Sequence, residues 1–182
     1  MKLKKLFAVV LSCALCVGVL SACGSTDAPS VDETPDSSAS GETAPEAAGA
    51  DVAALADSIL AVNPISNQLK LDDNTINLDI ALPADSFTAY AGALSNDQDD
   101  AGRVIVIAAA AGQEAVVEDA LEAYRQAQVA FFGNYPEFAD AQAKLENEYA
   151  LVSGNGVVIL SVASNECPDA DAMISAVEEL VK

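Results

Sequence analysis

Apolar and polar residues divide the chain into three stretches. A short basic start is followed by a continuously apolar stretch at residues 6–20, and then by a segment of small, polar and acidic residues. From residue 51 onward, apolar positions recur at spacings typical of helices and strands. The pattern predicts a signal peptide at residues 1–22, an anchor cysteine and disordered acidic linker at 23–50, and one domain at 51–182.

Helical spacing of apolar residues marks four segments of the domain. The first predicted helix is capped by Asp51 and ends before Pro64. The longest is expected over residues 113–132, a short one over 136–146, and Pro168 fits the first turn of the last. The apolar stripe of the longest helix is expected to consist of Val117, Leu121, Tyr124 and Phe131.

Three segments have the pattern of strands. Alternation over residues 75–82 predicts a first strand, and residues 86–94 form a second candidate, with Phe87, Ala89 and Ala91 on one face and Tyr90 on the other. The clearest buried strand is residues 103–110, because its apolar residues follow one another without a polar interruption.

A hairpin and a fold class complete the structural expectation. Asn155-Gly156 separates two apolar runs, and both turn positions of such a hairpin need positive φ, which favours these two residues. The element order then predicts an α+β domain of two layers, with helices packed on one face of a mainly antiparallel sheet.

Charge and composition exclude several classes of function. The 182 residues carry a formal charge of −20, and removing residues 1–22, which hold three lysines and no acid, makes it −23. Repulsion of that size from phosphates excludes nucleic acid as a partner and disfavours peripheral binding to anionic lipid surfaces. The chain has no histidine, which removes histidine-based catalysis and histidine-containing metal sites.

Leu20-Ser21-Ala22-Cys23 resembles the lipobox of bacterial lipoproteins. The resemblance implies that the sulfur of Cys23 receives a diacylglyceryl group and that cleavage leaves Cys23 as the new amino terminus. The alternatives are an ordinary secretory signal in which Cys23 is incidental, or a retained membrane anchor. With Cys13 and Cys16 removed with the signal, only Cys167 remains, so the domain is expected to have no internal disulfide.

Several features of the domain together resemble a bacterial lipoprotein family known as domain of unknown function 4358. They are the strand core Val104–Ile107, the helix that ends in Phe131-Phe132, the turn Asn134-Tyr135-Pro136-Glu137, and the apolar strand that begins after Gly154. The resemblance covers roughly residues 51–182. It implies a fold and a location outside the cytoplasm, and it implies no chemistry.

The sequence contains no complete motif for calcium binding, phosphate binding or nucleophilic catalysis. The acidic run Asp97–Asp100 with Gly102 starts like an EF-hand loop, but Ala108 stands where the bidentate glutamate belongs, so we expect a solvated acidic loop. Gly154-Asn155-Gly156 lacks the Lys-Ser/Thr of a phosphate loop and is expected to be a turn. No nucleophile motif is present, and no pair of carboxylates stands out among the 22 acidic residues of the domain.

Two single features remain open. Cys167 precedes a helix, which could acidify its thiol, but a capping or partly buried structural cysteine is the stronger interpretation. Tyr135-Pro136 is either an exposed apolar recognition point or, more simply, a turn between helices whose tyrosine packs on the core.

The sequence therefore predicts where the protein is located and assigns it no biochemical activity. We expect a non-enzymatic interaction or accessory module of the cell envelope, anchored through Cys23 on the outer face of the cell membrane, with a cell-envelope protein as its possible partner. The alternative is a small-ligand or cation-binding domain, and a hydrolase using carboxylates alone is a third. No catalytic residue, cofactor or metal ligand is assigned.

Overall fold

A five-stranded antiparallel sheet forms the centre of the domain. The computed structural model describes residues 51–182, so the expected signal peptide, the linker and Cys23 lie outside the described part. Every neighbouring pair of strands is antiparallel, in the order β1-β2-β3-β5-β4. The strands are β1 (Gln68–Lys70), β2 (Phe87–Ser95), β3 (Arg103–Ala109), β4 (Tyr149–Gly154) and β5 (Val157–Val162).

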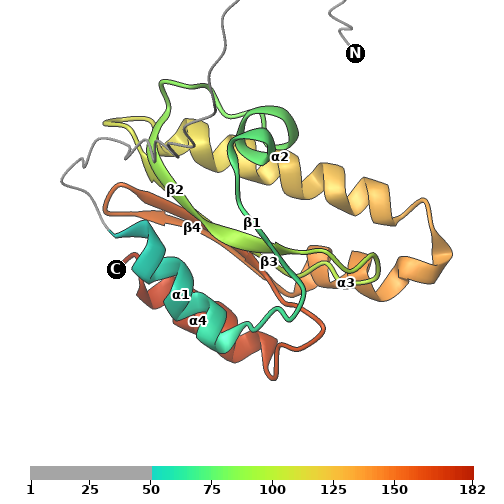
Figure 1. The fold of residues 1–182 in the computed structure, drawn as a ribbon. Coiled ribbons are helices and arrows are strands. Elements are labelled where there is room, and N and C mark those ends of the chain that lie inside the picture. Colours follow the sequence, from blue (N-terminus) through green and yellow to red (C-terminus); the bar gives the residue numbers. More distant parts are fainter. Residues whose placement is uncertain (1–50) are drawn as a thin grey trace, which may run out of the picture. The chain divides into compact units, whose positions relative to one another are not determined.

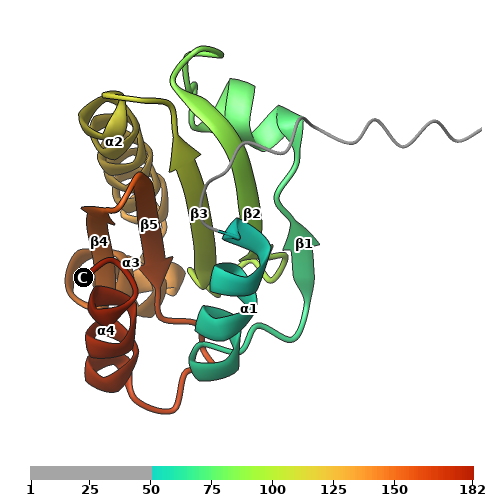
Figure 2. The same ribbon diagram turned by 90° about the vertical axis from the view of Figure 1, so that its left-hand side faces the viewer.

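Helices cover both faces of this sheet (Figures 1 and 2). On one face, α1 (Val52–Val62) and α4 (Ala170–Glu179) pack against Val104 and Val106 of β3. On the other, α2 (Glu114–Phe132) and α3 (Ala139–Asn147) pack against the intervening residues of β3 and β5. The α+β class and the antiparallel sheet are confirmed, whereas the expected two layers are three. The unbroken apolar run in β3 is the physical reason, because a strand covered on both faces needs apolar side chains on both.

N-cap aspartates determine where α1 and α4 begin. The Asp51 carboxylate accepts hydrogen bonds from the backbone nitrogens of Ala53 and Ala54, at 3.2 and 3.1 Å, as predicted for an N-cap. The last helix is capped in the same way by Asp169, whose carboxylate accepts from the Ala172 nitrogen. Pro168 therefore precedes the cap instead of occupying the first turn of α4, and the helix begins later than expected.

The strand predicted at residues 75–82 is wrong. This segment begins with a short π-helix, η1 (Thr75–Asp79), in which the Ile80 nitrogen donates to the Thr75 carbonyl oxygen at 2.9 Å. Ile76 and Ile80 are buried and Leu78 between them is 74% exposed, a sequence pattern that also fits one helical turn. The Asp72 carboxylate accepts from both the backbone nitrogen and the hydroxyl of Thr75, which favours the helical form.

A β-bulge changes the faces expected for β2. The register shifts between Phe87 and Ala89, so Phe87 lies on the α2 side of the sheet with Tyr90, with the two ring centroids 6.0 Å apart. Ala89 and Ala91 point to the opposite face, as predicted. The predicted hairpin is confirmed, with Asn155 and Gly156 at φ of 55° and 79° between β4 and β5.

Within residues 51–182, no helix has the length and apolar character needed to cross a bilayer.

Candidate functional site

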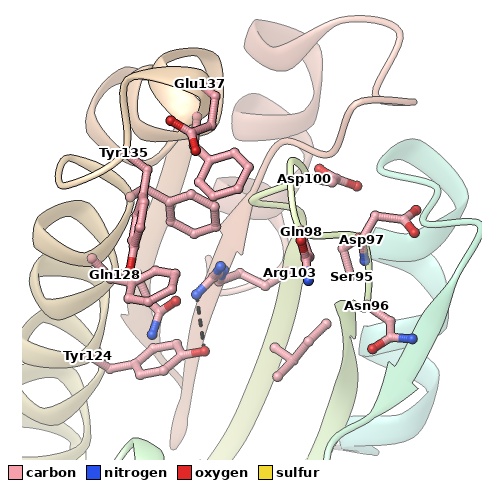
Figure 3. A pocket seen from close by; sticks show the side chains of 14 residues that line it. Ser95, Asn96, Asp97, Gln98, Asp100, Arg103, Tyr124, Gln128, Tyr135 and Glu137 are labelled. Carbon is pink, nitrogen blue, oxygen red and sulfur yellow. Dashed lines mark hydrogen bonds between the residues drawn. The ribbon is translucent and has the colours of Figure 1, made fainter.

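A pocket opens on the α2 side of the domain, where two loops meet. One is the β2–β3 loop, and the other is the corner at which α2 ends and η2 (Pro136–Phe138) begins. The pocket has a volume of about 520 Å³ (Figure 3). Its lining residues are Leu94, Ser95, Asn96, Asp97, Gln98, Asp100, Arg103, Tyr124, Gln128, Phe131, Phe132, Tyr135, Glu137 and Phe138.

Four aromatic rings from the helical corner form one wall. Phe131 and Phe132 end α2, while Tyr135 and Phe138 flank the turn that Pro136 starts, and the contacting rings have centroids 5.5–5.8 Å apart. Phe132 is buried, but Phe131 is 52% exposed. The prediction that Phe131 completes the core stripe of α2 is wrong, because the neighbouring Phe132 occupies that place, whereas Val117, Leu121 and Tyr124 are buried as expected.

Arg103 lies deep in the pocket, at the first residue of β3. Its side chain extends between the aromatic wall and the β2–β3 loop (Figure 3), and the residue is only 6% exposed. Nε donates to the Ala101 carbonyl oxygen at 2.9 Å, and Nη1 donates to the Tyr124 hydroxyl at 3.0 Å. The guanidinium carbon lies 5.4 Å from the centroid of the Tyr124 ring. All of these partners are neutral.

The electrostatics of Arg103 differ from those of Arg125, the other arginine of the chain. Arg125 forms a two-pronged ion pair with Glu122 and also lies over the Tyr149 ring, at 4.0 Å from its centroid. That pairing raises the pKa of Arg125. Arg103 forms no ion pair with any carboxylate of residues 51–182, and burial lowers its pKa.

The acidic loop opposite the aromatic wall has a structural role for two of its members. Asp100 is 7% exposed, and its Oδ1 accepts from the backbone nitrogens of Gly102 and Asn165, both at 2.9 Å. Asp97 accepts from the Asn67 side-chain amide at 2.8 Å. The loop connects two strands as predicted, but Asp100 is not solvated as expected. In the described part of the chain, no three acidic or cysteine side chains gather closely enough to hold a metal ion.

The structure decides between the alternative interpretations of Tyr135 and Cys167. Tyr135 is 42% exposed and lines the pocket, so the simpler interpretation, that it packs on the core, is wrong. Cys167 is half-buried, its Sγ lies 3.8 Å from the Val62 carbonyl oxygen, and burial raises the pKa of its thiol. This environment fits the partly buried structural cysteine and opposes an acidified thiol.

Sequence reasoning missed Arg103 as a site residue and treated Tyr124 only as core. A signal was present, because Arg103 is one of only two arginines in the chain and directly precedes an unbroken apolar run. An arginine at the start of a doubly covered strand lies in a largely apolar environment and needs partners there, which would have marked it for attention.

One family model matches this chain, and its description is Domain of unknown function (DUF4358), over residues 62–162. The chain belongs to this family. The matched segment runs from the last residue of α1 to the end of β5 and contains every residue that lines the pocket. No curated protein and no solved structure matches the chain.

Proposed function

We propose that this member of the DUF4358 family is a lipid-anchored extracytoplasmic protein whose domain binds a small organic ligand in the Arg103 pocket. The pocket itself carries the proposal. Its volume of about 520 Å³ falls within the range of roughly 300–1,000 Å³ that is typical of small-molecule sites. Its aromatic wall and the polar groups that converge opposite it combine the apolar surface and the orienting polar groups that such sites use.

The pocket favours the ligand-binding alternative over the interaction module that the sequence suggested first. A protein partner usually needs a broad surface, whereas this site is a concavity with a buried charged group at its inner end. An inorganic cation is disfavoured, because Arg103 lies in the pocket and Asp100 is already engaged by two backbone nitrogens.

A protein partner is the second candidate, and one observation favours it. Phe131 and Tyr135 expose large apolar side chains beside each other at the mouth of the pocket, with ring centroids 5.5 Å apart. Exposed aromatic side chains are frequent anchors of protein interfaces. Crosslinking in cells followed by mass spectrometry supports this candidate if one envelope protein is recovered through this corner, and opposes it if none is.

We further propose that the pocket binds without catalysing a reaction. Arg103 stays protonated and cannot serve as a base, and the chain has no histidine. Ser95 Oγ accepts a hydrogen bond from the Asp97 backbone nitrogen and has no basic side chain as a partner. Asp97, Asp100 and Glu137 line the pocket, but none of them accepts a hydrogen bond from a hydroxyl of its lining, so no nucleophile there is paired with a base as covalent catalysis requires.

Membrane attachment through Cys23 is the other part of the proposal, and the lipobox supports it. Two or more long acyl chains hold a protein stably on a membrane, at about 0.8 kcal/mol for each buried CH₂. We expect the wild-type protein to incorporate a palmitate analogue during growth, and Cys23→Ser to abolish the label. Cys167→Ser is the control and should leave the label unchanged. An unlabelled wild-type protein would overturn the anchor.

Ligand binding is tested by titrating fragments of different charge into the ¹⁵N-labelled protein. Backbone signals of the pocket should shift, while those of the distant Asn155 turn should not. Phe131→Ala removes an exposed side chain that lines the pocket, and Val116→Ala removes another exposed apolar side chain of the same helix that does not. Only Phe131→Ala should weaken binding. If no fragment of any charge shifts the pocket signals, the proposed function is wrong.

A further inference from the structure

We infer that the ligand is a small organic monocarboxylate with an apolar body, and that its carboxylate binds the guanidinium of Arg103. The inference rests on the proposed function, because it names the chemical class that the pocket selects. It follows from three observations: a guanidinium nitrogen without a hydrogen bond, the lack of an ion pair to Arg103, and the distribution of acidic and apolar groups around it.

The first observation is a guanidinium nitrogen left over for a ligand. Nε and Nη1 of Arg103 hold the Ala101 carbonyl and the Tyr124 hydroxyl, and Nη2 makes no hydrogen bond to any described residue. Every side-chain nitrogen or oxygen that is sealed from solvent within residues 51–182 does have a hydrogen-bond partner. Nη2 is therefore accessible, and since Arg103 lines the pocket, the accessible edge faces its interior.

The second observation is a buried positive charge that forms no ion pair within residues 51–182. The Asp100 carboxylate attracts it through space but accepts its hydrogen bonds from two backbone nitrogens instead. Removing a charge from water is costly unless it is paired and hydrogen-bonded. Arg125 shows how this chain pairs an arginine for purely structural purposes, with both oxygens of Glu122 at 2.6 and 2.8 Å. The hydrogen-bond partners of Arg103 are all neutral, so an incoming carboxylate would form the direct ion pair that Asp100 does not, and would gain a charge-assisted hydrogen bond.

The third observation limits the ligand to one negative charge. Asp97 and Glu137 line the pocket on opposite sides of Arg103 (Figure 3), and they repel a second anionic group. A phosphate monoester carries about −1.5 to −2 at neutral pH and is disfavoured for the same reason. The rings of Phe131, Phe132 and Phe138 offer apolar surface to the remainder of the molecule. A monocarboxylate with an aromatic or aliphatic body satisfies all three constraints.

The test is a set of probes that share one body and differ in charge. 3-Phenylpropionate, 3-phenylpropanol, 3-phenylpropylamine and phenylsuccinate carry an anion, no charge, a cation and two anions on the same phenyl framework. Affinities for the wild-type protein are measured from the shifts of the pocket signals. We expect 3-phenylpropionate to bind at least tenfold more tightly than each of the other three. A higher affinity for the amine or the alcohol would overturn the assignment without any mutation.

Variants locate the effect on Arg103. Arg103→Met should reduce the affinity for 3-phenylpropionate at least tenfold and leave that for 3-phenylpropanol nearly unchanged, while Phe131→Ala should weaken both alike. Arg103→Lys, which keeps the charge but loses the planar fork, should give an intermediate loss and serves if the methionine variant does not fold. Unchanged affinity for 3-phenylpropionate in a folded variant would contradict the inference.

The outcomes separate this inference from the proposed function. If other fragments shift the pocket signals and 3-phenylpropionate does not, the carboxylate assignment fails and ligand binding stands. If no fragment of any charge shifts them, both fail.

Discussion

Arg103 and Tyr124 provide a stability test of whether the buried guanidinium is kept for binding. If Arg103 serves the fold, removing it should lower the free energy of unfolding; if it serves a ligand, the ligand-free domain should tolerate its loss. Tyr124→Phe removes the hydroxyl that accepts from Nη1 at 3.0 Å. The double variant Tyr124→Phe/Arg103→Met also removes the positive charge of Arg103 and replaces it by an apolar, unbranched side chain.

The structure sets the expected magnitudes. Hydrogen bonds that involve a charged group are worth about 1.5–3 kcal/mol, and water in the pocket can replace part of this one, so Tyr124→Phe should cost about 1.5 kcal/mol. Replacing a buried ion pair by apolar side chains of similar volume is often neutral or stabilising, by about 1–4 kcal/mol, and removing the unpaired charge of Arg103 avoids the same kind of desolvation cost. Against that gain, the Ala101 carbonyl loses its donor, at a cost of about 1–3 kcal/mol. We therefore expect the double variant to match the wild-type protein within about 1 kcal/mol.

Urea unfolding followed by far-ultraviolet circular dichroism, without ligand at neutral pH, measures these differences. The double variant should recover the stability that Tyr124→Phe alone loses. If the double variant is instead less stable than Tyr124→Phe by more than about 1 kcal/mol, Arg103 is a net stabiliser of the fold, and the argument that its charge awaits a ligand is refuted.

Two further predictions concern the sheet and its edge. Gly92→Ala should lower the free energy of unfolding in urea by about 3 kcal/mol or more, because the added Cβ would lie 1.9 Å from the Val104 carbonyl oxygen at a φ of +146°. Gly112→Ala is the control, since Gly112 also has a positive φ, of +75°, but has open space around it, and it should cost clearly less. Equal costs of the two variants would count against the close contact at Gly92. Burial and the hydrogen bond to Asp73 raise the pKa of Tyr90 to about 12, so its phenol should titrate about two pH units above an ordinary tyrosine in ultraviolet absorbance. Because the neutral form is favoured in the folded state, this contribution to stability is present below pH 10 and is lost between about pH 10 and 12; an ordinary titration near pH 10 would contradict the contact.

The sequence predicted correctly those features that depend only on residues close together in the chain. Asp51 caps α1, and Asn155-Gly156 turns the β4–β5 hairpin, because a carboxylate at a helix start and two positive φ angles are requirements of adjacent residues. The buried strand β3 was equally clear from its uninterrupted apolar run.

Features that depend on distant contacts were not predictable in the same way. Ile76, Leu78 and Ile80 alternate in exposure, and the sequence alone does not separate a strand from a single helical turn over so few residues. The bulge that moves Phe87 to the other face of β2 depends on the partner strand. The three layers, by contrast, could have been predicted from β3, since a strand that is apolar on both sides needs helices on both.

The candidate site likewise combines parts that were recognisable in the sequence with an arrangement that depends on distant contacts. The sequence singled out the acidic loop around Asp97 and the Tyr135-Pro136 turn separately, and the structure places both on one pocket. What joins them is Arg103, whose deep position between the two is a property of the folded sheet.

The side-chain Nε–H signals of the two arginines test the central claim most directly. Arg103 and Arg125 are the only arginines of the chain, and Arg125 is already paired with Glu122, so it serves as an internal control. Titrating 3-phenylpropionate into the ¹⁵N-labelled protein should shift the Arg103 signal together with the pocket backbone signals, and should leave the Arg125 signal in place. A saturating titration in which the pocket signals move and the Arg103 signal does not would contradict the account.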